Sequence, residues 1–108
     1  MKKVFVCSPY RNSNPVKFVK NLKLAKSYCK KIVEAGYMPL APHLYFTHIY
    51  NDDDVNERRF GIYMGMKWLE ECDEVHVLGN YVSEGMYQEI MTAKQYNKKI
   101  VYVKEPLK

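Results

Sequence analysis

Residues 2–15 read KKVFVCSPYRNSNP, and this stretch predicts how the chain begins to fold. The segment Lys2–Cys7 is rich in Val and Phe, which predicts a buried first strand, and a polar loop follows it from Ser8. Asn14 before Pro15 is typical of a helix N-cap with proline at the first helical position. The chain is therefore expected to open with a strand, a loop and a helix, as a β-α-β unit does.

Three further strands and two further helices are expected along the rest of the chain. Short apolar and β-branched segments predict strands at Tyr37–Ala41, Glu74–Leu78 and Ile100–Val103. Apolar residues at three- and four-residue steps predict helices from Pro15 to Gly36, from an N-cap at Asp54 to Cys72, and from an N-cap at Ser83 to about Tyr96. A polar loop is expected from Pro42 to Asp54. The residues expected to face inward on these helices are Phe18, Leu22, Ala25, Cys29, Ile32, Val55, Ile62, Met66, Leu69, Met86, Ile90 and Ala93.

The order β-α-β-α-β-α-β contains no repeat, low-complexity tract or linker. Strands that alternate with crossover helices in so short a chain predict a mostly parallel sheet with helices on both faces. The expected fold class is α/β, a three-layer Rossmann- or flavodoxin-like fold with four or five strands and the first strand near the centre. We expect residues 1–108 to form one domain, because half of the chain would be close to the size limit for independent folding.

Composition and charge narrow the class of protein. Hydrophobic residues make up 47% and charged residues 27% of the sequence, which is ordinary for a globular domain and argues against a disordered or collagen-like chain. No apolar run approaches the ~18 residues that span a bilayer, so we expect a soluble cytoplasmic protein with no membrane association. The formal net charge of +5 favours anionic partners, which include phosphate-bearing small molecules and nucleic acid.

Neither a disulfide framework nor a metal site is expected. The cysteines are odd in number and lack the paired spacing of a zinc site, so we interpret them as small buried residues: Cys7, Cys29 and Cys72. A metal site could be imagined at His43, His48 and the run Asp52–Asp54. Three consecutive carboxylates of a regular element cannot all face one ion, however, and the calcium-loop pattern is absent. Capping and solvation of the second helix explain the acidic run better.

Ligands of open parallel sheets bind beyond the carboxyl ends of the strands. The segments that follow these ends are Ser8–Arg11, Pro42–His48 and Gly79–Gly85. Ser8, Tyr10 and Arg11 offer a hydroxyl, a stacking ring and a guanidinium where a nucleotide would have its base and phosphate. An ordinary turn is the alternative. This loop holds no glycine, which disfavours a P-loop or a dinucleotide fingerprint.

The stretch Ser83-Glu84-Gly85-Met86-Tyr87-Gln88-Glu89 has the most informative spacing. Ser83, Gly85 and Met86 fall at a helix N-terminus, where free backbone N–H groups and the helix dipole attract an anion such as phosphate. Glu89 lies about one and a half turns further along, where its carboxylate could point back toward the same pocket. The alternatives are a plain serine N-cap and an exposed helical glutamate.

Arg58 and His43 are two further candidate ligand contacts. Arg58 and Arg59 lie in the first turns of the second helix, where basic side chains are poorly matched to the helix dipole. One of them could hold an anionic ligand, and a surface salt bridge is the alternative. His43 lies in one of the segments expected at the ligand-binding edge of the sheet.

Together these residues resemble the nucleoside 2-deoxyribosyltransferase family. The resemblance rests on the order of elements, the loop Ser8–Arg11, the run Trp68–Val75 that enters the third strand, and the spacing Ser83-x-Gly85-x-x-x-Glu89. Within the family the chain is most similar to the nucleoside 5′-monophosphate N-glycosidases. The likeness of layout spans nearly the whole chain, and the Ser83–Glu89 spacing is its most specific motif.

The resemblance implies roles for Glu89 and Ser83. Glu89 matches the glutamate that attacks the anomeric carbon, and Ser83 matches a position that is serine in the nucleotide-using hydrolases and aspartate in the nucleoside-using transferases. A carboxylate there would repel phosphate, whereas a hydroxyl beside N–H groups would bind it. The family aspartate that assists proton transfer to the leaving base is Gly65 here. Asp73, eight residues further along, matches a position with a structural role.

The expected function is hydrolysis or transfer at the N-glycosidic bond of a (deoxy)nucleoside 5′-monophosphate, with Glu89 as nucleophile and no metal or cofactor. Gly65 favours the alternative, a non-catalytic nucleotide-binding module of the same fold. The lysines of the first helix motivate a third hypothesis, a nucleic-acid-associated protein. No helix-turn-helix or RNA-binding signature supports it, so nucleic acid is not expected to be the main partner. The ten tyrosines and the family likeness lead us to expect a homodimer.

Overall fold

The four strands form one parallel sheet in the order β2-β1-β3-β4 in the computed structural model, which describes residues 1–103. The strands are β1 (Lys3–Cys7), β2 (Met38–Leu40), β3 (Glu74–Val77) and β4 (Lys99–Tyr102). Because β1 pairs with β2 on one side and with β3 on the other, the predicted central position of the first strand is confirmed. The end of the predicted 1–108 domain, residues 104–108, lies outside the described residues.

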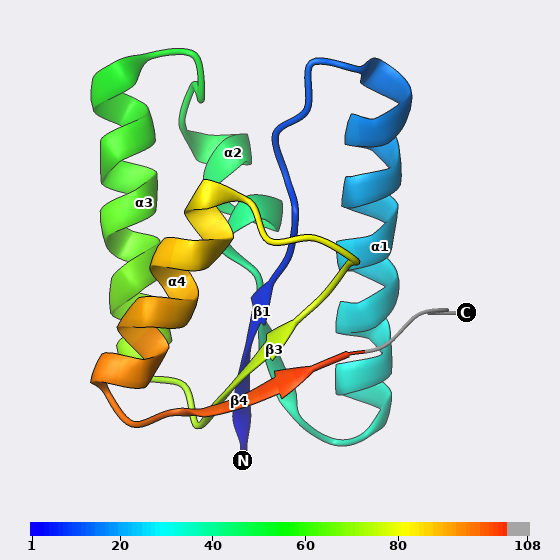
Figure 1. The fold of residues 1–108 in the computed structure, drawn as a ribbon, viewed down its shortest axis with the longest axis vertical. Helices are drawn as coiled ribbons and strands as arrows, with labels where there is room; N and C mark the ends of the chain where they lie inside the picture. Colours follow the sequence, from blue (N-terminus) through cyan, green and yellow to red (C-terminus); the bar gives the residue numbers. More distant parts are fainter. Residues whose placement is uncertain (104–108) are drawn as a thin grey trace.

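Helices cover both faces of the sheet, so the predicted α/β architecture with three layers is confirmed (Figure 1). Helix α1 lies on one side of the strands, and α3 and α4 lie on the other. The helices are α1 (Pro15–Glu34), the single 3-10 turn η1 (Pro42–Leu44), α2 (Phe46–Ile49), α3 (Val55–Glu70) and α4 (Glu84–Gln95). Within residues 1–103, no helix is both long and apolar enough to cross a membrane.

The three long helices begin at the caps that the sequence predicts. The Asn14 side chain accepts from the Val16 N–H at 2.9 Å, and the Ser83 hydroxyl accepts from the Met86 N–H at 3.2 Å. Asp54 likewise accepts from two N–H groups in the first turn of α3. Each cap satisfies N–H groups that have no partner inside the helix, which is worth about 1 kcal/mol.

The main core lies between the sheet and the pair α3 and α4. Alternation along β1 turns Phe5 and Cys7 toward these helices, where they pack with Leu69 and Met86. All four side chains are at most 1% exposed. The carboxyl end of β1 is therefore pressed against the first turn of α4, which matters for the chemistry of that end.

The structure corrects the prediction of a polar loop between β2 and α3. This segment contains the two short helices η1 and α2, and Phe46 of α2 is buried with its ring centroid 4.7 Å from that of Trp68. One buried aromatic residue thus anchors the segment on α3. The ends of the other elements differ from the predicted ends by one or two residues.

The predicted inward face of α3 is also partly wrong. Val55 and Ile62 are 53% and 55% exposed, whereas the buried side of the helix carries Gly65 and Leu69. Because glycine has no apolar side chain, the apolar periodicity of the sequence does not indicate this face. A Cβ at Gly65 would lie 3.3 Å from the Pro42 ring, so the missing side chain is what lets η1 approach the helix closely.

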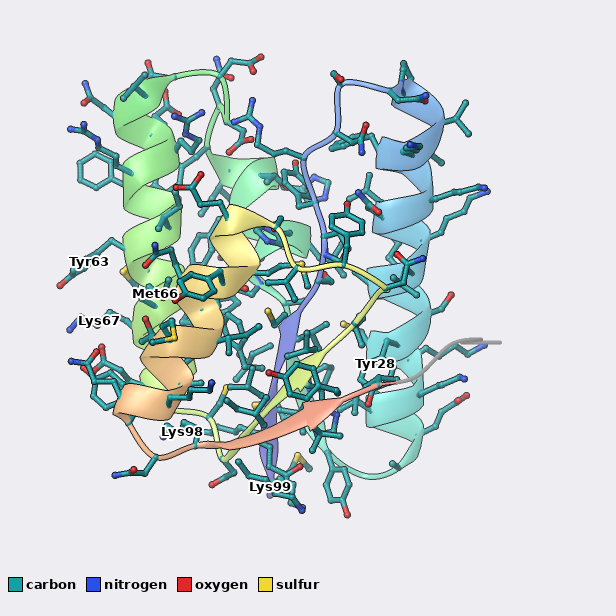
Figure 2. The ribbon with its side chains drawn as sticks, viewed as in Figure 1. Tyr28, Tyr63, Met66, Lys67, Lys98 and Lys99 are labelled. Carbon is teal, nitrogen blue, oxygen red and sulfur yellow. The ribbon has the colours of Figure 1, made fainter. Side chains whose placement is uncertain are left out.

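A chain of polar contacts joins α1 to the face of the sheet that lies opposite the main core. The Tyr28 hydroxyl lies 2.6 Å from His76 Nδ1, His76 Nε2 lies 2.9 Å from Glu74 Oε1, and Lys2 Nζ lies 2.9 Å from Glu74 Oε2. Figure 2 labels Tyr28 on α1. Hydrogen bonds from His76 and Lys2 lower the pKa of Glu74 to about 2. The ionised Glu74 accepts from Nε2–H, which leaves Nδ1 to accept from the Tyr28 hydroxyl.

Glu74→Gln should destabilise the protein at pH 7 by about 1.5–3 kcal/mol, the range for a hydrogen bond to a charged group. The pKa of Glu74 is lower in the folded protein than in the unfolded chain, so its contribution is present above about pH 4.5 and is lost as the pH falls toward 2. Urea unfolding of parent and variant across this range measures the difference.

Glu70→Gln is the matched control, since Glu70 pairs at 3.3 Å with Lys67, which Figure 2 labels on α3. Loss of this partly exposed pair should cost less than about 0.5 kcal/mol. Equal losses in both variants would show that the Glu74 contacts are no more than a surface ion pair.

Candidate functional site

The loops that follow β1 and β3 leave the sheet side by side. β2 lies on one side of β1 and β3 lies on the other, so the strand order reverses between β1 and β3. Open parallel sheets bind ligands at such a reversal. Gly79 just after β3 has φ of +90°, and a Cβ there would lie 3.0 Å from the Pro9 ring. Glycine at this position lets the two loops pack against each other.

A cavity of about 410 Å³ opens at this edge of the sheet, between the loop after β1, the segment η1–α2, and the helices α3 and α4. Its volume falls within the ~300–1,000 Å³ of small-molecule sites, and its walls are mostly apolar. All nine site residues named from the sequence line it: Ser8, Tyr10, Arg11, His43, Arg58, Ser83, Gly85, Met86 and Glu89. The structure thus brings together four segments that are far apart in the chain.

Glu89 is the one buried carboxyl group of the cavity. It is 9% exposed, and its Oε1 atom has no hydrogen-bond partner within residues 1–103. Burial raises the pKa of Glu89 to about 7, and the Cys7 thiol offsets a smaller part of this rise. A carboxyl group that lacks solvent and lacks a partner is costly, which is typical of groups that act on a ligand.

The start of α4 offers hydrogen-bond donors to the same cavity. Ser83 caps the helix, and Ser8, which is 2% exposed, lies across from it in the loop after β1. A Cβ at Gly85 would meet nothing within 4 Å, so the first turn of α4 is open beside the cavity. Backbone N–H groups and the helix dipole favour an anion at this end.

The ring of Tyr10 is already packed on one face. It stacks on His43, with ring centroids 4.7 Å apart and 9° between the planes, and the Phe18 ring meets it edge-on. Burial lowers the pKa of His43 to about 4, so the imidazole is neutral at pH 7. The stacked pair therefore forms an uncharged wall, with His43 covering one face of the Tyr10 ring.

The two arginines of the cavity differ in their partners. Arg11 pairs with Asp52 at 3.1 Å and lies 3.7 Å from Asp53, whereas the guanidinium of Arg58 makes no ion pair in the part of the chain that the structure describes. Asp54 caps α3, so the acidic run is engaged in pairing and capping. Arg58 is the arginine that retains an unneutralised charge for a ligand.

Gly65 lies in the cavity wall. A side chain at Gly65 would need the Pro42 ring to move, because even a Cβ would be 3.3 Å from it. Asp73, by contrast, accepts from the Lys3 N–H at 2.8 Å at the entrance of β1, in keeping with the structural role expected of it. The cavity therefore lacks a carboxylate at the Gly65 position.

Several residues that line the cavity were not predicted from the sequence. Thr47 and Tyr50 come from the segment that was expected to be a loop, and Glu57, whose carboxylate accepts from the Asn51 N–H at 2.9 Å, comes from the first turn of α3. The sequence signal for helical structure in this segment was Pro42, which suits the first position of a helix, with the apolar Phe46 four residues later.

Residues 2–103 match the model of a family described as a domain of unknown function (DUF7768). No curated protein matches the sequence. The fold is similar to that of a 2-deoxyribosyltransferase from Bacillus psychrosaccharolyticus, with 16% identity and a TM-score of 0.75 over 93% of this chain and 70% of that one. It is also similar to BcmB, a CMP N-glycosidase from Clostridium botulinum, with 20% identity and a TM-score of 0.61 over 94% and 70% of the two chains. The family resemblance inferred from the sequence is thereby confirmed at the level of the fold.

Glu89→Gln should stabilise the free protein at pH 8 by about 2–3 kcal/mol and have little effect at pH 4. The pKa of Glu89 is higher in the folded protein than in the unfolded chain, so the parent loses stability as the pH rises from about 4.5 to about 7. Glu84→Gln, in the exposed first turn of the same helix, is the control and should stabilise at neither pH. A parent and a Glu89→Gln variant of equal stability at pH 8 would show that Glu89 is solvated.

Proposed function

The chain belongs to the DUF7768 family, and we propose that it cleaves or transfers at the N-glycosidic bond of a (deoxy)nucleoside 5′-monophosphate. The observation that carries this proposal is the buried Glu89 carboxyl, which has an unpartnered oxygen in a small-molecule cavity beside a helix N-terminus. Solved structures of the same fold include a 2-deoxyribosyltransferase and a CMP N-glycosidase, which supports this reaction class. The size of the cavity favours a small molecule over nucleic acid.

In the proposed reaction, ionised Glu89 attacks C1′ of the sugar as the bond from C1′ to the base breaks. The bonding electrons leave with the base, and a glycosyl ester of Glu89 forms through an oxocarbenium-like transition state. Water then attacks C1′, the bond from C1′ to the Glu89 oxygen breaks, and a water proton passes to the departed base, which releases the sugar phosphate. When a second base attacks instead, it loses its proton to the departed base and a new nucleotide forms. Two displacements at C1′ retain its configuration. The reaction requires no metal or cofactor.

The environment of Glu89 suits a nucleophile. A pKa of about 7 leaves a substantial ionised fraction at neutral pH, and the ionised form lacks the water shell that would weaken its attack. The free Oε1 lone pairs have no competing donor within residues 1–103. Charge that develops on the sugar ring would be stabilised by the carboxylate in these mostly apolar surroundings.

The start of α4 is the proposed phosphate site. The Ser83 hydroxyl and the N–H groups of the first turn supply donors, and the open space beside Gly85 leaves room for the phosphate oxygens. Ser8 adds a buried hydroxyl, and Arg58 adds an unpaired positive charge at the same cavity.

A non-catalytic nucleotide-binding module is the second candidate. Gly65 favours it, because the cavity has no carboxylate at that position to assist protonation of the leaving base, and Pro42 fills the neighbouring space. Nucleotide affinity without release of base would identify this function.

We also propose that two copies of the chain form a dimer. Large apolar side chains are exposed on α3 and α4, and soluble monomers rarely expose many of these together. They are Phe60, Ile62, Tyr63, Met64, Tyr87 and Met91, each between 39% and 59% exposed. Sedimentation equilibrium measures the mass in solution directly.

We place the protein in the cytoplasm, as the sequence suggested. Its three cysteines are free thiols, two of them buried, and free thiols persist in reducing compartments.

Glu89→Gln should abolish the release of free base from a nucleoside 5′-monophosphate while leaving nucleotide affinity within about tenfold, since the nucleophile acts mainly in the transition state. A chromatographic assay of free base across a panel of monophosphates, with calorimetric titration of the same ligands, separates the two effects. Gln95→Ala, at the end of the same helix and outside the cavity lining, is the control for general damage to α4. Unchanged base release in Glu89→Gln would reject Glu89 as the nucleophile.

Ser83→Asp should weaken binding of a nucleoside monophosphate far more than binding of the matching nucleoside. Aspartate is also a good N-cap, so the helix keeps its start while the new carboxylate repels the phosphate. Calorimetry with the two ligands gives the ratio of affinities, and Ser83→Asn, a neutral cap of the same shape, should preserve that ratio. If the Ser83→Asp variant binds both ligands as the parent does, the phosphate lies elsewhere.

A further inference from the structure

Arg11 bridges two loops that lie at the same end of the molecule, which is the top in Figure 1. Its guanidinium lies 3.1 Å from the Asp52 carboxylate, donates to the Asp52 carbonyl oxygen at 3.4 Å, and lies 3.7 Å from the Asp53 carboxylate. Arg11 and Asp52 are 41 positions apart in the chain. One side chain therefore ties the loop after β1 to the loop before α3.

This bridge lies between two hollows of the protein. The cavity that contains Glu89 is one of them, and an outer groove beside the start of α1 is the other. The residues that line only the groove are Asn12, Ser13, Pro15, Phe18 and Asp53. The residues that line both hollows are Tyr10, Arg11 and Asp52. The wall that separates the cavity from the groove is thus formed by the Tyr10 ring and the ion pair.

Other contacts hold the backbone of both loops in place. In the loop after β1, the Asn21 side chain of α1 donates to the Tyr10 carbonyl oxygen at 3.2 Å. In the loop before α3, the Asn51 side chain accepts from the Asp53 N–H at 3.0 Å. The Arg11 side chain has several rotatable bonds and is 50% exposed. It is therefore the part of the wall that can move while both loops keep their conformation.

We propose that the pair Arg11–Asp52 is the gate of the cavity, and that the ligand enters and leaves through the outer groove when the pair opens. Opening separates two charges and breaks no covalent bond. An exposed ion pair shifts an equilibrium by about two- to fivefold and is screened by salt, so this gate slows exchange without sealing the cavity. That the ligand is a nucleotide rests on the proposed function, whereas the gate does not.

The charges around Arg11 favour a gate over the direct phosphate contact that the sequence suggests. Two carboxylates already compensate the guanidinium, so a phosphate would have to displace Asp52 to bind it. Arg58 has no ion pair within residues 1–103 and lines the same cavity, so a phosphate could reach it without displacing a carboxylate.

The test measures access to the cavity in the ligand-free protein. Ser8→Cys places a thiol in the cavity at a position that is 2% exposed, and methyl methanethiosulfonate, a small neutral reagent, modifies that thiol when it gains access. The same reaction of the parent gives the background from the native cysteines. Added to Ser8→Cys, either Arg11→Gln or Asp52→Asn should raise the rate of modification about two- to fivefold. The reversed pair, Arg11→Asp with Asp52→Arg, should return the rate toward the starting value.

The direction of the two changes separates a gate from an electrostatic effect on the thiol. Loss of the Arg11 charge would make the thiol at position 8 less acidic, and loss of the Asp52 charge would make it more acidic. A purely electrostatic effect would therefore move the two rates in opposite directions, whereas opening of a gate raises both. Thr47→Cys, on the α2 side of the cavity, is a second reporter and should show the same changes.

Asp53→Asn is the matched control, because it removes the same charge from the same loop. Asp53 is 90% exposed and lies further from Arg11, so this variant should change the rate much less than Asp52→Asn. Raising sodium chloride to about 0.5 M should speed modification when the pair is intact and have no effect in Arg11→Gln.

Unchanged rates in Arg11→Gln and Asp52→Asn, or rates that move in opposite directions, would overturn the proposal. Modification of the thiol needs no substrate. Faster modification in a protein that releases no base would therefore reject the proposed function and leave the gate standing. Unchanged modification in a protein whose base release depends on Glu89 would reject the gate alone.

Discussion

The parallel pairing of β1 with β3 is the constraint on which the candidate site depends. The register sets Cys7 beside Val77, so both strands end at the same edge of the sheet. Gly79, with φ of +90° and no side chain, then lets the loop after β3 pack against Pro9. A β-carbon there would strain the backbone and meet the proline ring. The start of α4 and the loop after β1 face one cavity because of this close approach.

The same arrangement explains why a carboxyl group is buried with an unpartnered oxygen. Helix α4 crosses the carboxyl end of β1 with Met86, Ile90 and Ala93 turned inward, and Glu89 is the polar member of that buried side. An apolar residue at this position would cost less to bury, since a desolvated carboxylate weakens the folded state. Glutamate at this place is therefore a feature that packing alone does not call for, which supports the proposed role of Glu89 at a ligand site.

The sequence predicted those parts of the structure whose signal is local. Helix caps at Asn14, Asp54 and Ser83 and the β-branched strands determine the order of elements, and the rule for parallel sheets then brings the loop residues together. The buried face of α3 was predicted wrongly because it packs against η1 through Gly65. Glycine has no apolar side chain, so the sequence pattern gives no sign of this contact. The burial of Glu89 depends on which face of α4 meets the sheet, which only the folded chain shows.

The most direct test of Glu89 as nucleophile is a crystal structure of the Glu89→Gln variant with a nucleoside 5′-monophosphate bound. We predict C1′ about 3–3.5 Å from a side-chain atom at position 89, the distance of a near-attack geometry. The phosphate should accept from the Ser83 hydroxyl and the N–H groups that begin α4. A nucleotide whose phosphate lies away from Ser83 and the start of α4, and whose C1′ is far from position 89, would contradict the account.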